Sequence, residues 1–206
     1  TGTAVLLTAA GLSSRMGAFK PMIRLGEKTL IEYTLDAFRT AGIAETVIVT
    51  GHRHDEIERH LAGRGISFIQ NERYAQTEMF DSLQIGLTAI AATGGYDCAF
   101  FLPGDMPAVE PAVLRQLMAK LESEDYDVVF PSTGTRRLHP PLIRANLFEP
   151  LIAYSGEEGL RGAFRAIDAK IGYVITQETG CLIDVDTPED YARVQDHMKH
   201  SLAQED

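Results

Sequence analysis

The chain has 206 residues, of which 45% are hydrophobic and 23% are charged, a composition typical of a soluble globular protein. Its formal net charge of −10 argues against nucleic-acid binding, which requires clustered Lys and Arg, and no apolar stretch approaches the roughly 20 residues that span a bilayer. The two cysteines, Cys98 and Cys181, have no disulfide or zinc-binding spacing, so we expect a single domain over residues 1–206 in a reducing cytoplasm, with no membrane partner.

Short apolar runs alternate with longer amphipathic segments along the chain. Strands are predicted at residues 4–8, 46–50, 67–69, 98–102 and 128–130, and helices at residues 30–40, 54–61, 80–91 and 111–121. The second half is less regular, with strands expected at residues 139–143 and 171–175 and helices at residues 159–167 and 187–200. This order predicts an α/β fold whose mostly parallel sheet is flanked by helices on both faces.

Residues 7–20, LTAAGLSSRMGAFK, connect the first strand to a loop of small and hydroxyl-bearing residues. Backbone amides around Gly11 and Ser14 can converge on an anion, and Arg15 and Lys20 add positive charge. The patterns GxxxxGK[ST] and GxGxxG are both absent, which argues against a P-loop ATPase and a dinucleotide-binding dehydrogenase. The loop therefore suits a triphosphate, although on its composition alone a glycine-rich surface turn is an equal interpretation.

Ligands of open α/β sheets bind beyond the carboxyl ends of the strands. This rule predicts a rim made of residues 9–15, Gly51, residues 103–106, Pro131 and His139. The other histidines, such as His52, His54 and His60, are interpreted as surface residues.

Two acidic segments supply candidate metal ligands. Asp105 follows a predicted strand in FFLPGDMP, and Asp186 lies in IDVDTPEDY, where alternation places Asp184 on the same side of an extended segment. Carboxylate oxygens are suitable ligands for Mg²⁺. A turn-forming or helix-flanking role is the alternative for each. Two carboxylates beside a triphosphate loop favour metal-dependent nucleotidyl transfer.

The segments LTAAGLSSRMGAFK, PGDMP and DVDTPEDY together resemble the LAAGxSxRMGxxK signature and the two metal motifs of the MobA-like nucleotidyltransferases, in the same order. The resemblance covers essentially the whole chain. It implies a Rossmann-like GT-A fold, a nucleoside triphosphate bound with Mg²⁺, and transfer of the nucleoside monophosphate to a phosphorylated acceptor with release of pyrophosphate.

The resemblance also implies roles for individual residues. The nucleotide-binding residues would be Ala9, Ala10, Gly11, Ser14, Arg15, Lys20, Asn71 and Ser82. Arg15, Lys20 and Asp105 would be catalytic, and Asp105 and Asp186 would hold the metal. Glu78 stands where the family usually has glycine.

The nucleotide and the acceptor are inferred from two further segments. The Ala9-Ala10-Gly11 triplet resembles the first motif of the cytidylyl and uridylyl branches. The methyl group of Ala10 narrows the slot beside the base, which favours a pyrimidine over a purine. CTP is therefore the first choice of nucleotide. LHPPLI, residues 138–143, resembles the GHPxxx segment of the molybdenum cofactor cytidylyltransferases, with Leu138 in place of glycine. That likeness implies an acceptor-binding His139, with Arg136 and Arg137 nearby, and molybdopterin as a candidate acceptor.

Two other hypotheses stay open. A sugar- or polyol-phosphate cytidylyl- or uridylyltransferase would use the same residues on a different acceptor. A regulatory module would bind the nucleotide without turnover, although it would not need both metal carboxylates. The sequence does not indicate an oligomeric state.

Overall fold

The computed structural model describes residues 2–11, 19–104, 106, 110–177 and 188–202. The strands are β1 (Gly2–Ala9), β2 (Arg24–Leu25), β3 (Lys28–Thr29), β4 (Thr46–Thr50), β5 (Ile66–Gln70), β6 (Tyr96–Pro103), β7 (Val128–Ser132), β8 (Leu142–Arg144) and β9 (Ile171–Ile175). The α-helices are α1 (Leu30–Thr40), α2 (His54–His60), α3 (Met79–Thr93), α4 (Pro111–Ser123), α5 (Phe148–Ala153), α6 (Gly159–Ile167) and α7 (Pro188–Leu202). The short 3-10 helices are η1 (Lys20–Met22) and η2 (Ala145–Leu147).

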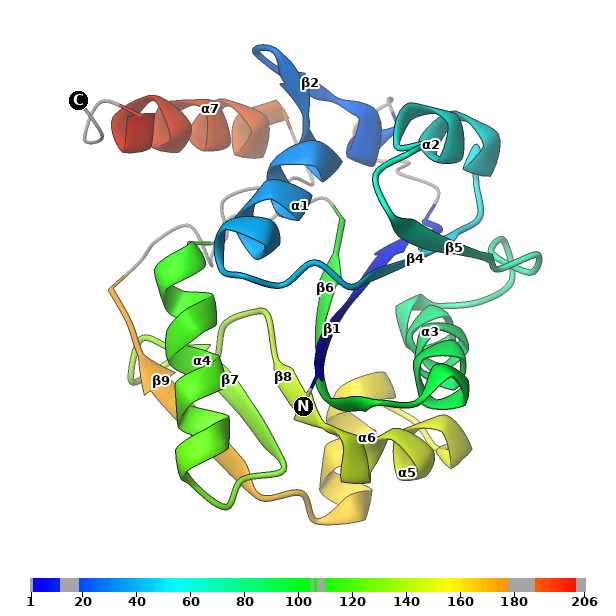
Figure 1. Cartoon of the computed structure of the whole chain (residues 1–206), viewed down its shortest axis with the longest axis vertical. Coiled ribbons are helices and arrows are strands. Elements are labelled where there is room, and N and C mark those ends of the chain that lie inside the picture. Colours follow the sequence, from blue (N-terminus) through cyan, green and yellow to red (C-terminus); the bar gives the residue numbers. More distant parts are fainter. Residues whose placement is uncertain (1, 12–18, 105, 107–109, 178–187, 203–206) are drawn as a thin grey trace.

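Within the described residues, one seven-stranded sheet has the order β5-β4-β1-β6-β8-β7-β9 (Figure 1). Strands β5, β4, β1 and β6 are parallel to their neighbours, and β7 is parallel to β9. Strand β8 is antiparallel to both β6 and β7. The sheet is therefore mostly parallel, as the sequence predicted.

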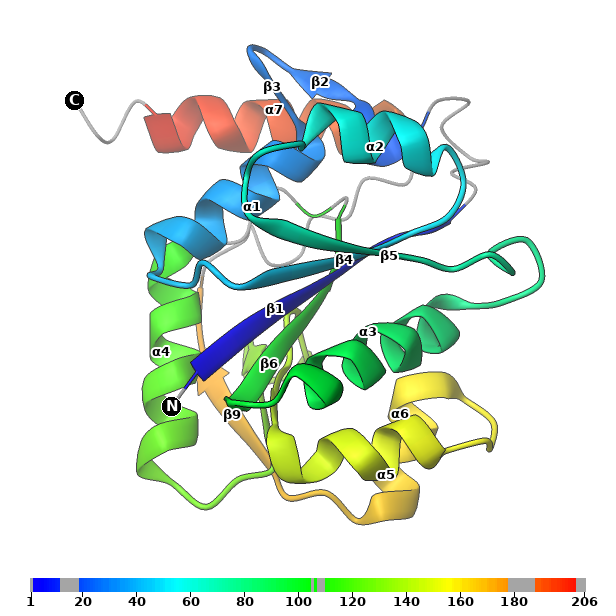
Figure 2. The ribbon, with the colours of Figure 1, turned by 45° about the vertical axis from the view of Figure 1, so that its right-hand side comes forward.

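Helices cover both faces of this sheet because side chains alternate along its strands. In β1, Val5 and Leu7 pack into the core that contains α1, α2 and α4, whereas Ala4 and Leu6 pack into the core that contains α3, α5 and α6. Figure 2 shows α3, α5 and α6 together on one side of the sheet and α1 and α2 on the other. Both cores hold fully buried aliphatic and aromatic side chains, each of which stabilises the fold by about 1.5–3 kcal/mol on burial.

Helix α3 lies unusually close to β1 at Gly86. A Cβ atom added there would stand 2.1 Å from Cδ1 of Leu6, a distance that real carbon atoms do not reach. The absence of a side chain thus lets α3 pack directly on the central strand. This contact holds the middle of α3 against β1, and the first turn of the same helix carries Met79 and Ser82.

Helix α1 begins at a capping box that extends into a buried ionic network. Thr29 caps the helix, and its partner Glu32 accepts hydrogen bonds from the Thr29 amide, from Nη2 of Arg64 at 2.6 Å and from Nε2 of His60 at 2.8 Å. Burial raises the pKa of Glu32, but these donors outweigh it and bring the pKa to about 2. The interpretation of His60 as a surface residue is wrong, because its side chain is largely buried in this network.

Helix α7 packs against the β2–β3 hairpin and the start of α1. Val194 is fully buried with Leu25 and Leu30, and the hydroxyl of Tyr191 donates to the carbonyl of Arg24 at 2.7 Å. Helix α7 follows the second acidic segment in the sequence. These contacts hold it on the side of the sheet where α1 lies (Figure 2).

Several predicted boundaries differ from the structure. The strand expected at residues 139–143 begins only at Leu142, because Pro140 and Pro141 have no N–H to donate to a neighbouring strand. Pro131, expected beyond a strand end, lies inside β7. The β2–β3 hairpin and helix α5 were not predicted, since each is too short to produce a periodic pattern.

Candidate functional site

A pocket of about 280 Å³ opens at the carboxyl end of β1, and we call it the edge pocket. Its lining residues come from the ends of β1 and β6, from η1 and from the β5–α3 connection with the first turn of α3. They are Thr8, Ala9, Ala10, Gly11, Lys20, Pro21, Tyr74, Thr77, Glu78, Met79, Ser82 and Pro103. The structure thus brings five of the predicted nucleotide residues around one pocket: Ala9, Ala10, Gly11, Lys20 and Ser82.

The β4–α2 connection supports the floor of the edge pocket. The backbone amide of His52 approaches the carbonyl of Ala10 at 3.5 Å, and its ring packs against Phe19 and Tyr74. A Cβ atom on Gly51 would lie 2.6 Å from Cβ of Tyr74 and 3.0 Å from Cβ of Ala10. Gly51 therefore allows these two pocket residues to close on the strand end, which agrees with its predicted place at the rim.

Asn71 and Ser82 are both buried, each with 3% of its surface exposed. The side-chain amide of Asn71 donates to Oγ of Ser82 at 3.2 Å and to Oγ1 of Thr77 at 2.9 Å, while its carbonyl oxygen accepts from the amide of Arg73. Asn71 is not among the residues that line the pocket. It lies behind the wall, where it orients the two hydroxyl groups that do.

Glu78 places a carboxylate on the wall of the edge pocket. It is the N-cap residue of α3, where its side chain accepts from the amide of Asp81 while the Glu78 amide donates to Oδ2 of Asp81 at 2.8 Å. The acidic residue found where the family usually has glycine thus has a local role, since it caps the helix that carries Ser82.

The remaining predicted residues of this site are Ser14, Arg15, Asp105 and Asp186, and all four lie outside the described residues, as does Asp184. The residue before Asp105 is described. The amide of Gly104 donates to the carbonyl of Thr8 at 3.1 Å, which ties the end of β6 to the end of β1 beside the pocket.

His139 lies apart from the edge pocket, in a recess between β7 and α6. Part of its surface meets solvent, but neighbouring protein atoms displace water from the imidazole and the guanidinium of Arg137 adds positive charge, so the pKa of His139 falls below 6.5. The imidazole is therefore neutral at pH 7. Arg137 lines the same recess, whereas Arg136 does not.

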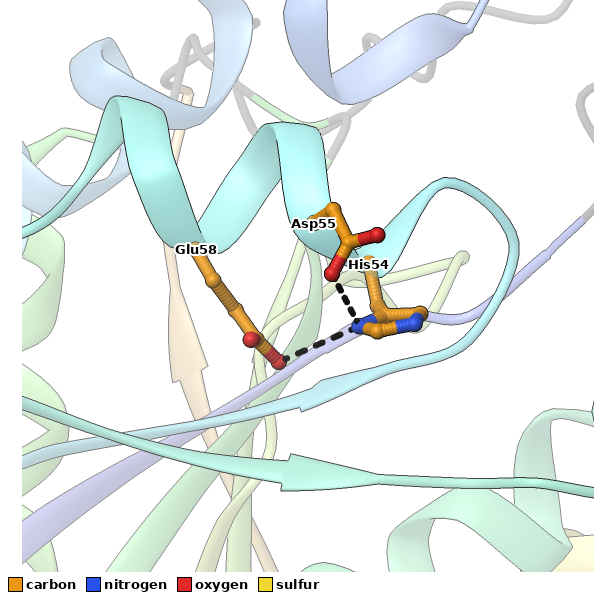
Figure 3. A group of neighbouring side chains, drawn as sticks. All are labelled: His54, Asp55 and Glu58. Carbon is orange, nitrogen blue, oxygen red and sulfur yellow. Dashed lines mark ion pairs between the residues drawn. The ribbon is translucent and has the colours of Figure 1, made fainter.

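Figure 3 shows a group of possible metal ligands that the sequence did not indicate, made of His54, Asp55 and Glu58 on α2. Nδ1 of His54 lies 3.3 Å from Oδ1 of Asp55 and 3.8 Å from Oε1 of Glu58. His54, expected at the surface, is half-buried. Because 75% of the Asp55 side chain is exposed and Glu58 already accepts from Thr50, we assign no metal to this group.

Several lining residues were missed by sequence reasoning. Tyr74, Thr77 and Met79 lie 60 residues or more beyond the strand whose end they cover, and their residue types are common in cores and loops. Only the likeness of Asn71 and Ser82 to family positions, with Glu78 between them in place of a glycine, had indicated that this segment reaches the site.

Residues 5–171 match the family described as MobA-like NTP transferase domain. The chain is 27% identical to the molybdenum cofactor cytidylyltransferase of Escherichia coli K12 over 189 residues, which are 90% of this chain and 92% of that protein. It is also 31% identical over 130 residues, 62% of this chain, to the bifunctional protein GlmU of Francisella tularensis, of which the matched part is only 27%.

The fold is also found among solved structures. A nucleotidyl transferase from Methanothermobacter thermautotrophicus superposes with a TM-score of 0.81 at 26% identity, over 98% of this chain and 99% of that one. In the part of the chain that the structure describes, no helix combines the length and apolar character needed to cross a bilayer. The family match covers most of the chain, and the chain belongs to the MobA-like NTP transferase domain family, with its nucleotidyltransferase fold.

Proposed function

We propose that this chain is a Mg²⁺-dependent cytidylyltransferase that moves CMP from CTP to a phosphomonoester acceptor and releases pyrophosphate. The main support is the edge pocket, which gathers Ala9, Ala10, Gly11, Lys20 and Ser82 at the carboxyl end of the central parallel strand. Four of these belong to the single segment of residues 7–20 that suits a triphosphate.

The choice of CTP rests on the size of the base slot. Ala9 and Ala10 line the pocket with methyl groups, and Ala10 is buried near Gly51, where an added Cβ atom would come within 3.0 Å of its methyl group. A purine needs more width than a pyrimidine beside the same wall. The likeness to a molybdenum cofactor cytidylyltransferase, at 27% identity over 90% of this chain, supports the same choice.

The proposed chemistry requires positioning and charge neutralisation. An acceptor phosphate oxygen attacks the α-phosphorus of CTP, the bond from that phosphorus to the bridging oxygen breaks, and pyrophosphate leaves. Arg15 and Lys20 would hold the β- and γ-phosphates and stabilise the charge that develops on the leaving group. Ser14 would bind phosphate, and Ser82, oriented by Asn71, would contact the nucleoside.

The metal would be held by Asp105 and Asp186. Two carboxylates are a suitable donor set for Mg²⁺, because this ion prefers hard oxygen ligands and retains several waters. The hydrogen bond from Gly104 to Thr8 supports this role for Asp105, since it fixes the preceding residue beside the edge pocket. When bound, Mg²⁺ neutralises phosphate charge and helps to align the reacting groups.

A substrate panel tests the proposal. The protein is incubated with Mg²⁺ and each of CTP, UTP, GTP and ATP, together with a pterin phosphate such as molybdopterin or a sugar or polyol phosphate, while pyrophosphate is measured. We expect pyrophosphate with CTP and a phosphomonoester only. A preference for UTP with a sugar phosphate would favour the second hypothesis, and release with no pair would remove the enzymatic claim.

The regulatory hypothesis is separated by binding. If the protein binds CTP tightly but never releases pyrophosphate with any acceptor, it is a nucleotide-binding module. We expect turnover instead, because a sensor would have no use for two metal carboxylates as well as two phosphate-binding cations.

A further inference from the structure

Of the described residues that line the edge pocket, Glu78 is the one that carries a carboxylate. It stands where the family usually has glycine, so the family pattern does not explain it. Its backbone has a φ of −105° and a ψ of 177°, an extended conformation that residues with a side chain adopt freely. The position therefore does not require glycine, and the glutamate is accommodated without backbone strain.

Capping of helix α3 does not by itself account for a glutamate at this position. The carboxylate accepts from the amide of Asp81, and the Glu78 amide donates to Oδ2 of Asp81 at 2.8 Å. Helix N-caps favour serine, threonine, asparagine and aspartate over longer side chains. The cap uses only part of the accepting capacity of the two carboxylate oxygens. Glu78, which is exposed, is thus an oriented acceptor that can also bind a ligand.

The segment that ends at Glu78 also closes the base slot. A Cβ atom on Gly51 would lie 2.6 Å from Cβ of Tyr74 and 3.0 Å from Cβ of Ala10, so these two side chains lie beside the same backbone position. The hydroxyl of Thr77, next to Glu78, accepts from the buried side-chain amide described above at 2.9 Å. The wall that carries the carboxylate is therefore continuous with the wall beside Ala10.

Met79 adds an apolar surface beside this carboxylate. Its side chain lines the pocket and leaves 51% of the residue exposed. A flexible thioether makes favourable contacts with aromatic rings. A flat heterocycle in the slot would cover Met79 with its face and reach Glu78 with a polar edge. A ribose has no flat apolar face to cover the thioether, so the pair of side chains suits the base.

A carboxylate at this place distinguishes the parts of a pyrimidine nucleotide. It repels the phosphate groups, which Lys20 attracts, and it accepts hydrogen bonds but donates none. Cytosine presents an amino group that donates, whereas uracil presents a carbonyl oxygen at the same ring position. The carboxylate would bind the first group and repel the second. Glu78 therefore favours cytosine over uracil.

We propose that Glu78 is a specificity-determining residue, which accepts a hydrogen bond from the amino group of cytosine and so selects CTP over UTP. The inference rests on the proposed function, because it concerns the nucleotide of the same transfer reaction. It separates two pyrimidine nucleotides that the methyl group of Ala10 admits equally.

Nucleotide binding in the absence of an acceptor tests this assignment. The full chain is titrated with CTP, UTP and 2′-deoxy-CTP in the presence of Mg²⁺, and isothermal titration calorimetry gives the dissociation constants. We expect the wild type to bind CTP roughly tenfold to a hundredfold more tightly than UTP, the range typical of one hydrogen bond to a charged group. Glu78→Gln should bind CTP and UTP about equally, because an amide can accept from an amino group or donate to a carbonyl oxygen.

The matched control is Asp81→Asn, which removes the same charge from the same helix cap at a residue outside the pocket lining. It should keep the wild-type preference for CTP. Because glutamine retains an oxygen that can accept from the Asp81 amide, Glu78→Gln should fold as the wild type does. The midpoint of urea unfolding checks this.

A preference for CTP that Glu78→Gln retains would overturn the assignment and leave the proposed cytidylyltransferase standing. An equal loss of preference in Asp81→Asn would overturn it too, since the effect would then come from the helix cap. A Glu78→Gln effect confined to the ratio of CTP to 2′-deoxy-CTP would contradict it by locating the carboxylate at the ribose. A wild type that binds neither CTP nor UTP would remove the proposed function and this assignment together.

Discussion

The edge pocket and the recess between β7 and α6 that contains His139 differ in how their polar groups are held. Around the edge pocket, Asn71 orients Ser82 and Thr77 through hydrogen bonds of 2.9–3.2 Å. In the recess, Arg161 has no partner among the described residues, and His139 has none that the structure records. Thus the hydroxyl groups of Ser82 and Thr77 have a protein partner, whereas Arg161 and His139 have none among the described residues.

The difference has a structural cause. The edge pocket is built on four consecutive parallel strands, where crossover helices bring loop after loop to one edge. The recess lies where antiparallel β8 interrupts the parallel order, so a loop rather than a helix follows β7.

The largest expected effect tests whether the edge pocket is catalytic. Replacing Asp105 by Ala should lower turnover by a factor on the order of 10³ or more, because it removes one of two proposed metal carboxylates. Some metal-independent CTP binding should remain. Steady-state pyrophosphate release and CTP titration without metal measure the two quantities, and the exposed Asp97→Ala variant, at the opposite end of β6, should retain turnover. An Asp105→Ala protein with normal turnover would show that Asp105 does not hold a metal needed for the reaction.

The next largest effect concerns the stability that the Glu32 network at the start of α1 gives to the fold. The pKa of Glu32 in the folded protein is about 2, below the ordinary value of 4.5. The network therefore stabilises the protein fully above pH 4.5, and this stabilisation is lost as the pH falls toward 2. The contribution at pH 7 is about 3 kcal/mol. Glu32→Gln should remove this contribution, so that the free energy of unfolding falls less between pH 7 and pH 2 than it does in the wild type. Urea unfolding across this pH range measures the difference.

The exposed Glu149→Gln variant is the control for this measurement, since its side chain has no partner in the described structure. It should lose as much unfolding free energy at acid pH as the wild type does. If Glu32→Gln also lost as much as the wild type, the network would not control stability at acid pH.

A third substitution tests the close contact between α3, whose first turn lines the edge pocket, and β1. Gly86→Ala should destabilise the fold by about 1–3 kcal/mol, because overpacking against Leu6 outweighs the gain of about 1 kcal/mol in helix propensity. Thermal or urea unfolding measures the change. The double variant Leu6→Ala/Gly86→Ala should lose less unfolding free energy than the two single variants lose together, since the small residue at position 6 removes the clash. Simple additivity would contradict the proposed contact.

The smallest effect concerns nucleotide choice. Ala10→Gly removes a methyl group from the base slot, and the ratio of kcat/KM for GTP to that for CTP should rise by roughly tenfold. Ala9→Gly is the companion variant on the same strand end. An unchanged ratio in both would show that the methyl groups do not determine the nucleotide.

The sequence indicated the residues that line the edge pocket better than those that line the recess between β7 and α6. Residues 9–20 form one contiguous motif, and the strand ends that carry Gly51 and Pro103 follow from the alternation of apolar runs. The recess between β7 and α6 combines Phe130 and Arg137 with Arg161, which belongs to a helix that begins more than 20 residues further along the chain. His139 was signalled by a short segment of family likeness, but Arg161 lies on a helix whose residues carry no motif.

Transfer of radiolabel tests the central claim most directly. The protein is incubated with Mg²⁺, CTP labelled at the α-phosphorus and a phosphomonoester, and the products are separated and identified by mass. We expect the label to move to the acceptor, unlabelled pyrophosphate to appear in equal amount, and both products to be lost in Asp105→Ala. Label that remains on CTP with every phosphomonoester, although CTP binds, would contradict it.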